Sequence, residues 1–145
     1  MIAVWAALSR QRRRLLVEAA AELLRARLQL LPLPGLDWQR ALGARSVGTA
    51  AVVADRPPDG SAGDVGWAVS VAARVVPWRS VCLPQAIAAQ RMLRRRGIPG
   101  RAVVGARRSA SEKPIDLHVW VLVDGRPIVG GSGHGSYEPV VAYDV

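Results

Sequence analysis

Cysteine and histidine are scarce in this chain. Cys82 is the only cysteine among the 145 residues, and His118 and His134 are the only histidines. A single cysteine excludes an internal disulfide bond and a cysteine-based zinc site. With only two histidines, we expect no dedicated metal site and no bound cofactor. The lack of disulfides is typical of a reducing compartment, so we expect a cytoplasmic protein.

Lysine is nearly absent and phenylalanine does not occur. Lys113 is the only lysine, yet the formal net charge is +9, so arginine supplies nearly all of the positive charge. A basic surface can bind nucleic acid. The sequence has no recognisable nucleic-acid motif, however, and no aromatic residues interleaved with its basic runs. We therefore expect an acidic peptide or protein partner and no nucleic acid.

The sequence also lacks an apolar run that could form a transmembrane segment. Residues 8–31 carry leucines at near-helical spacing, but Arg25 and Arg27 interrupt the apolar run. This pattern predicts an amphipathic helix that lies on its own core, or that docks against a partner or a membrane surface. Arginines also interrupt the N-terminal apolar region, so we expect no cleavable signal peptide.

Half of the residues are apolar, which predicts one folded domain over residues 1–145. Residues 54–66 are rich in Pro, Gly and Asp and predict a loop. A second helix is predicted from the N-cap candidate Asp64 to about Val76. A third is predicted from near Cys82 to Gly97, a residue that can end a helix in the left-handed conformation.

The hydrophobic spacing changes from helical to extended after residue 100. Residues 101–107, 117–123 and 126–130 predict strands, and Asp124-Gly125 predicts a tight hairpin turn. Residues 138–145 predict a final edge strand. Helices that are followed by an antiparallel sheet indicate the α+β class.

Cys82 stands where a predicted helix begins. A helix N-terminus and a nearby imidazolium both stabilise a thiolate. Pro84 falls in the first helical turn, where its missing N–H costs nothing. His118 lies on the strand face opposite the most continuous apolar row, or in a strand buried on both sides. Each residue alone is typical of a protein core, but together they predict a nucleophile and its base.

Two segments of the chain carry a resemblance to a known family. They are "CLPQAIAAQRMLRRRGIPGRAVVGARR", which begins at Cys82, and "LHVWVLVDGRPIVG", which begins at Leu117. They resemble the transglutaminase-like, papain-type leader peptidases of lasso-peptide biosynthesis. The resemblance covers residues from about 66 to 131, and the leucine- and arginine-rich helix before them is similar as well. It implies a transglutaminase-like (papain-like) core over residues 66–145, with N-terminal helices and a nucleophile-bearing helix packed on an antiparallel β-sheet.

The resemblance also implies an activity. Cys82 corresponds to the nucleophile, and His118 to the general base that later acts as an acid. The family removes the leader from a ribosomally made precursor peptide, and the freed amine is used by a partner lasso cyclase. The implied partners are therefore the precursor peptide, a separate leader-recognition protein and the cyclase.

The sequence departs from the family at Gly130, where the family has the Asp of its triad. A two-residue hairpin turn would pair Val123 with Arg126, and would therefore place His118 opposite Gly131. The return strand thus lies where a residue that orients the histidine is needed.

Three groups can replace the missing carboxylate. Ser132 is adjacent to that position, Asp116 shares the strand face of His118, and a backbone carbonyl can also accept a hydrogen bond from the ring. His134 and Glu138 lie in a predicted flexible, glycine-rich tail. Because the third residue of such a triad fixes the tautomer and the orientation of the histidine ring, its loss slows catalysis without necessarily abolishing it.

Other interpretations stay open. Gly130 favours a catalytically weakened, transglutaminase-like module that binds a peptide without cutting it. An acyltransferase of the same fold would share the Cys, the His and the oxyanion hole, and a nucleic-acid-binding protein would show steep salt dependence. The arginines at 94–96 predict a solvated helix end that can attract an acidic leader. Trp78 and Trp120 predict core packing, although Trp78 can also offer its indole N–H to the site.

Overall fold

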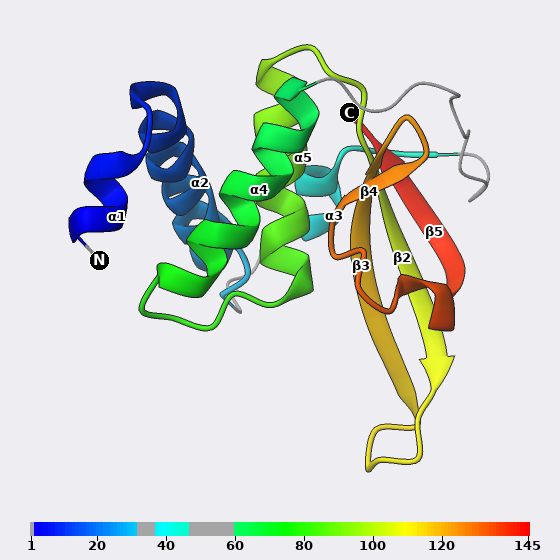
Figure 1. Cartoon of the computed structure of the whole chain (residues 1–145). Coiled ribbons are helices and arrows are strands. Elements are labelled where there is room, and N and C mark those ends of the chain that lie inside the picture. Colours follow the sequence, from blue (N-terminus) through cyan, green and yellow to red (C-terminus); the bar gives the residue numbers. More distant parts are fainter. Residues whose placement is uncertain (1, 32–36, 47–59) are drawn as a thin grey trace.

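The computed structural model describes residues 2–31, 37–46 and 60–145. The helices lie on one side of an antiparallel β-sheet (Figure 1). This arrangement confirms the predicted α+β class, with the helix that begins at Cys82 packed on the sheet. The described helices are α1 (Ile2–Ala7), α2 (Arg10–Gln29), α3 (Trp38–Leu42), α4 (Gly60–Val75) and α5 (Cys82–Arg95).

Helix α2 confirms the amphipathic helix predicted over residues 8–31. It begins after Ser9, whose hydroxyl accepts a hydrogen bond from the Arg12 N–H at 3.3 Å. This N-cap satisfies one of the backbone donors that a helix start leaves unpaired. The short helices α1 and α3 were not predicted.

Helix α4 begins at Gly60, so the start predicted at Asp64 was wrong. The loop predicted over residues 54–66 is therefore helical from residue 60 onward, and residues 54–59 lie outside the described part. The reason is tertiary packing, because Ala62 and Val65 are completely buried. Burial of this face overrides the low helix propensity of a glycine-rich sequence.

Helix α5 ends as the sequence predicts. Gly97 has a φ of +65°, in the left-handed region that favours glycine. The Gly97 N–H donates to the Arg94 carbonyl at 3.1 Å, and the Ile98 N–H donates to the Leu93 carbonyl at 3.1 Å. This Schellman pattern satisfies carbonyls in the last turn of the helix.

The sheet has the order β1-β5-β2-β3-β4, and its neighbouring strands are antiparallel. The strand predicted at residues 138–145 is present, but its placement at the edge was wrong, because β1 pairs with its free side. The strands are β1 (Ala44–Arg45), β2 (Arg101–Arg108), β3 (Ile115–Val123), β4 (Arg126–Val129) and β5 (Glu138–Asp144).

The two faces of the sheet have different cores. Val119, Val121 and Val123 of β3 join the large cluster that contains the buried helix residues. Trp120 and Leu122 belong to a small cluster on the other face. The connection from β4 to β5 crosses β3 and β2 (Figure 1) and contains a 3-10 turn, η1 (His134–Ser136).

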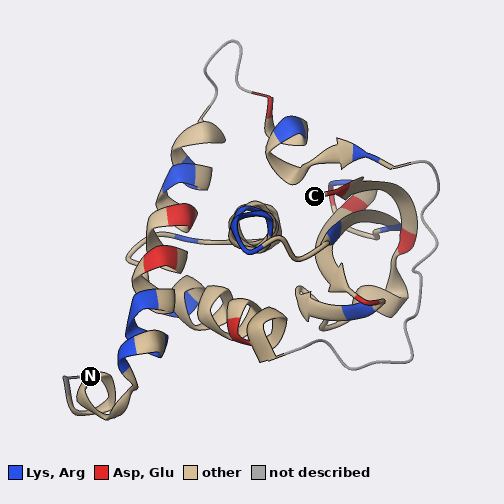
Figure 2. Ribbon diagram, turned by 90° about the horizontal axis from the view of Figure 1, so that it is seen from above, with Lys and Arg blue, Asp and Glu red and all other residues tan. Residues whose placement is uncertain are grey.

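Helix α5 is the central helix of the molecule. Figure 2 shows it end on, between α2 and the sheet. Its buried Gln90 donates from Nε2 to the carbonyls of Leu42, at 2.8 Å, and Tyr143, at 3.0 Å. One side chain thus ties α5 to the end of α3 and to β5, and fixes the helix that carries Cys82.

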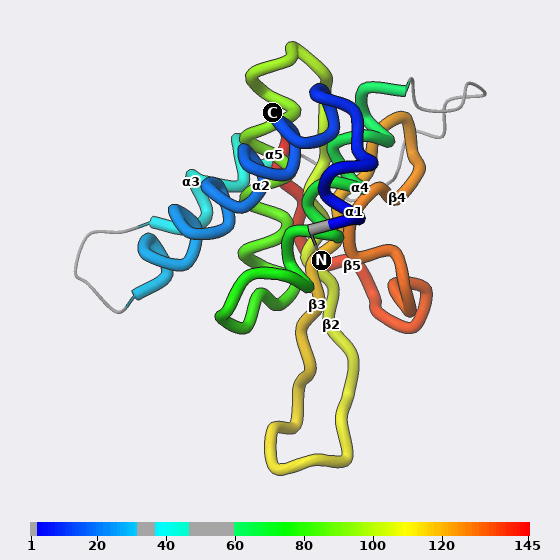
Figure 3. Tube along the Cα trace, turned by 60° about the vertical axis from the view of Figure 1, so that its left-hand side comes forward, coloured from blue at the N-terminus to red at the C-terminus, as the bar shows by residue number. Residues whose placement is uncertain are grey.

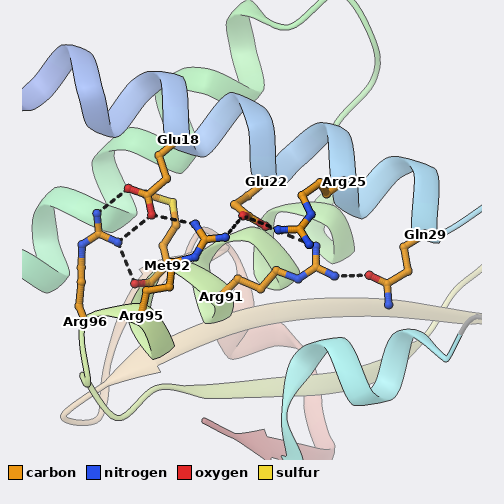
Figure 4. Close-up of polar contacts among 8 residues, drawn as sticks. All are labelled: Glu18, Glu22, Arg25, Gln29, Arg91, Met92, Arg95 and Arg96. Atoms are coloured by element: carbon orange, nitrogen blue, oxygen red, sulfur yellow. Dashed lines mark hydrogen bonds and ion pairs between the residues drawn. The ribbon is translucent and has the colours of Figure 1, made fainter.

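Ion pairs join α5 to α2 (Figure 4). Glu22 lies buried among the guanidinium groups of Arg91, Arg95 and Arg25, and Glu18 binds Arg95 and Arg96. The solvated helix end predicted at 94–96 is confirmed, because all three arginines are exposed, although Arg95 and Arg96 also bind the acids of α2. The two acids of α2 face inward, so the arginines of α5 serve as their counter-ions.

Candidate functional site

Cys82 is the first residue of α5, as the sequence predicts. Val81 is the N-cap and supplies no side-chain cap, while Gln85 donates from Nε2 to the Ser80 carbonyl at 2.7 Å. The thiol is half-buried and packs at the border of the helix-side core. The local structure thus places a cysteine at the positive end of a helix dipole, where a thiolate is stabilised.

His118 lies on β3 with its ring held by the main chain. Its Nε2 lies 2.7 Å from the carbonyl oxygen of Gly130. A carbonyl can only accept a hydrogen bond, so Nε2 carries the proton in this contact. The neutral ring then has its lone pair on Nδ1, which has no hydrogen-bond partner among the residues that the structure describes. His118 is therefore arranged to accept a proton at Nδ1.

The hairpin that brings Gly130 to His118 contains a bulge. Val123 pairs with Arg126 as predicted, but Val121 pairs with Val129, because Ile128 is the extra residue of β4. The predicted pairing of His118 with Gly131 was therefore wrong. The strand also ends at Val129, so the main chain leaves the ladder where it meets the histidine.

Aromatic rings fix the plane of His118. The Trp120 ring is stacked at a centroid distance of 5.9 Å, and the Tyr137 ring lies 5.1 Å away. Gly105 is the β2 residue directly opposite His118. A Cβ on Gly105 would lie 2.7 Å from the Trp120 ring and 2.9 Å from Tyr137 Cβ, so glycine makes room for both aromatic residues.

Asp116 does not orient the histidine. The Tyr137 hydroxyl donates to its carboxylate at 2.8 Å, and Arg107 Nε donates to the same oxygen at 3.0 Å. The Tyr137 hydrogen bond, followed by the Arg107 guanidinium, holds the pKa of Asp116 below its ordinary value. Ser132, the other predicted orienter, is exposed. The Gly130 carbonyl, rather than either predicted side chain, is thus the group that contacts the His118 ring.

Tyr137 links the surroundings of Cys82 and His118. Its hydrogen bond to Asp116 raises the pKa of Tyr137, and the negative charge of a Cys82 thiolate raises it further. The thiol is thus within electrostatic reach of the tyrosine whose ring contacts His118. In the described part of the chain, no hydrogen bond joins Sγ of Cys82 to the imidazole.

β3 has an open edge beside His118. Because β4 ends at Val129, residues 115–120 of β3 have no partner strand on the β4 side within the described part of the chain. Figures 1 and 3 show that the β2–β3 hairpin extends beyond the helices and that α5 begins beside β3. Leu117 is accordingly exposed although it belongs to the same row as the buried Val119. The backbone of β3 at this end can therefore pair with an extended segment.

The structure places His134 and Trp78 in surroundings that the sequence did not fully predict. His134 belongs to η1, where Nδ1 contacts the Gly131 carbonyl at 2.6 Å and its ring lies 5.6 Å from that of Trp120. The prediction of a flexible tail there was wrong. Trp78 packs against the core as expected, but its indole N–H is buried without a partner in the described residues.

Two groups that contact the His118 ring, Tyr137 and the Gly130 carbonyl, were not singled out from the sequence. Both lie in the glycine-rich segment that follows β4, and the run of glycines gave no periodic signal there. Tyr137 follows this run of glycines, and an aromatic residue there can signal a packed segment, because its ring needs a surface to pack on.

The described residues contain no group of three His, Cys, Asp or Glu side chains that could bind a metal ion together. None of the described helices has both the length and the apolar character of a membrane span.

Of three comparisons with known proteins, one found a match. The family model described as "Transglutaminase-like superfamily" matches residues 31–142. This match begins before the region expected from the sequence, so α3 and α4 fall within it together with all of the sheet except the last two residues of β5. A comparison with curated proteins found no match, and a comparison with solved structures found none either.

Proposed function

The chain belongs to the transglutaminase-like superfamily, and we propose that it is a cysteine peptidase that uses Cys82 and His118. Its substrate is the precursor of a ribosomally made lasso peptide, from which it removes the leader. The freed N-terminal amine then becomes available to a partner cyclase. The resemblance of the segments that begin at Cys82 and Leu117 supports this substrate class.

The contact between His118 Nε2 and the Gly130 carbonyl carries the proposal. With Nε2 protonated, Nδ1 takes the proton of the Cys82 thiol, and the thiolate attacks the scissile carbonyl carbon. The resulting oxyanion is stabilised by unpaired backbone N–H groups in the first turn of α5. His118 then donates the proton to the leaving amine, and a thioester forms.

Hydrolysis completes the cycle. His118 takes a proton from water, the hydroxide attacks the thioester carbonyl, and the carboxylic acid and the thiol are released. Both steps need Sγ of Cys82 and Nδ1 of His118 at hydrogen-bond distance. Catalytic hydrogen bonds of free enzymes often tighten only when substrate is bound.

Recognition of the precursor involves a second protein in this proposal. A separate leader-recognition protein presents the leader, and the net charge of +9 favours an acidic peptide. The open edge of β3 offers backbone groups to an extended segment that crosses the site.

The first prediction tests the nucleophile. The full chain is incubated with the precursor and the recognition protein encoded by neighbouring genes, and the product masses are measured. We expect leader and core fragments with the wild-type chain and neither fragment with Cys82→Ala, whose circular dichroism should be unchanged. Cleavage by Cys82→Ala at the wild-type rate would remove the peptidase proposal. A product mass that includes an added amine would indicate acyl transfer instead.

A peptide-binding module is the second candidate, favoured by the missing hydrogen bond between Cys82 and His118 in the described structure. Iodoacetamide discriminates between the two. An activated thiolate should react faster than a free thiol at the same pH. A reaction rate equal to that of a free thiol, together with binding of uncut precursor, would favour the module.

A further inference from the structure

Helix α2 carries an apolar stripe on its outward face. On the helix, Val17, Leu24 and Leu28 have exposed fractions of 60%, 42% and 52%, and Ala21 is exposed between them; Leu31, 45% exposed, follows two residues after the last helical residue, Gln29. The steps between these five residues alternate between four and three, the heptad spacing of a helix–helix seam. Together they are called the α2 stripe below. Large apolar side chains in one continuous exposed row mark an interaction surface.

The stripe is not the core-facing side of the helix. The opposite side of α2 buries Leu15, Leu16, Ala19, Leu23 and Ala26. Helix α2 therefore has two apolar sides, and only one is covered by the described part of the chain. Figure 2 shows α2 along the outside of the molecule, with α5 on its inner side.

The charges on α2 are sorted by side. Its two acidic residues, Glu18 and Glu22, bind the arginines of α5 and face inward (Figure 4). The exposed charged side chains nearest the stripe are arginines: Arg10 and Arg14 continue its spacing toward the start of α2, and Arg27 lies beside it, while Arg25 is paired with Glu22. The outward side of α2 thus presents an apolar row with arginines before it and beside it.

We infer that the α2 stripe is a docking surface for an amphipathic helix of a partner protein, with an apolar seam flanked by Asp and Glu. The a/d spacing is the narrow seam of a coiled coil, whereas a helix that lies on a membrane buries a wider apolar face. A second copy of this chain would bring arginines against arginines across the seam, and like charges there disfavour pairing. Acidic flanks complement the arginines.

This inference does not depend on the proposed peptidase activity. The stripe lies on α2, whereas Cys82 and His118 lie on α5 and β3. Its test needs no substrate and no cleavage, so the two proposals fail separately.

The test uses two synthetic helical peptides as probes. Both have four heptads with Leu at the a and d positions; one has Glu at the e and g positions and the other has Lys there. Each labelled peptide is titrated with the full chain, and fluorescence anisotropy is measured. We expect the Glu peptide to bind, with an affinity that falls as salt is added, and the Lys peptide not to bind.

Variants locate the binding surface. Leu24→Glu and Leu28→Glu should each weaken binding of the Glu peptide at least about tenfold, because each places a carboxylate in the seam. Val75→Glu is the matched control, since Val75 is 63% exposed on α4, and it should bind like wild type. The double variant Arg14→Glu and Arg27→Glu should transfer the preference to the Lys peptide. Equal far-ultraviolet circular dichroism checks that each variant is folded.

Several results would overturn the inference. Equal binding of both peptides would show that charge plays no role, and unchanged binding by Leu24→Glu and Leu28→Glu would place the contact elsewhere. Binding to vesicles of phosphatidylglycerol and phosphatidylcholine that Leu24→Glu abolishes, with no peptide binding, would assign the stripe to a lipid surface. Self-association that the same variant abolishes would assign it to a second copy.

Discussion

At the scale of single residues, Gly130 determines how His118 is held. Its φ of +69° turns its carbonyl toward the ring, and a Cβ there would lie 2.6 Å from the Val119 carbonyl oxygen. Gly133 has a similar φ of +72°, but nothing lies within 4 Å of its added Cβ. A substitution of Gly133 therefore carries only the cost of the left-handed backbone conformation, whereas a substitution of Gly130 also carries the cost of the steric clash.

We expect Gly133→Ala to lower the free energy of unfolding by about 1 kcal/mol, the cost of the left-handed conformation. Gly130→Ala should cost more, because the neighbouring strand must move as well, and should also lower turnover by shifting the carbonyl bound to His118. Gly130→Asp should behave like Gly130→Ala, although it restores the residue type of the family. Urea unfolding and single-turnover cleavage measure the two effects. Higher turnover in Gly130→Asp would contradict this role of the Gly130 carbonyl.

The side chains first predicted to orient His118 give a second prediction at this scale. Asp116→Asn and Ser132→Ala should leave turnover within about twofold of wild type, because neither side chain is bonded to the ring. His118→Ala, in contrast, should lose the ~10²–10⁴-fold of general acid–base catalysis. A loss of similar size in Asp116→Asn would show that its carboxylate reaches the ring during the reaction.

At the scale of elements, the contact between α2 and α5 depends on Glu22. The side chain of Glu22 is 3% exposed and lies among three guanidinium groups, whose side chains are partly exposed. Glu22→Gln should lower the free energy of unfolding by about 1–3 kcal/mol, because it removes charged hydrogen bonds from a buried site. Glu18→Gln is the control with a more exposed carboxylate and should cost at most about 1 kcal/mol. Thermal unfolding of both variants measures the difference, and equal melting temperatures would contradict the special role of Glu22.

The elements also show what could be predicted from the sequence. Helix α5 and the β3–β4 turn were predicted because Gly97 and Asp124-Gly125 are local signals, and a left-handed or tight-turn residue acts within a few positions. The inner position of β5 was not predicted, because it depends on pairing with β1, far away in the sequence. The bulge at Ile128 likewise depends on packing.

The candidate site likewise has local features that the sequence predicts and features that depend on tertiary packing. The elements that carry Cys82 and His118, a helix start and a strand, were predicted from local signals, whereas their roles as nucleophile and base stay a prediction. The identity of the orienter was left open between side chains and a backbone carbonyl. The contact with Gly130 arises from the bulge and from the main chain that leaves β4, and neither has a signature in the residue types.

At the scale of the whole molecule, ion pairs between distant segments make stability depend on pH. Arg96, the C-cap of α5, binds Glu18 of α2, and Arg101 of β2 bonds Asp144 of β5 at 2.7 Å. The hydrogen bond from Arg96 lowers the pKa of Glu18, and the hydrogen bond from Arg101 lowers the pKa of Asp144. Both carboxylates therefore hold protons less tightly in the folded chain than in the unfolded chain.

A lowered folded-state pKa contributes stability above the unfolded value and loses it as pH falls through the folded value. The ordinary values are 4.5 for Glu18 and 3.8 for Asp144. We therefore expect the contribution of these two carboxylates to the free energy of unfolding to be constant above about pH 5.5, and to decline as the pH falls below about 4.5. Urea unfolding at a series of pH values measures this decline. Glu18→Gln should show a smaller decline than wild type, because the chain then has one fewer carboxylate with a lowered pKa. An equal decline in the variant would show that the Arg96 pair does not contribute, and the acid sensitivity would then belong to other carboxylates.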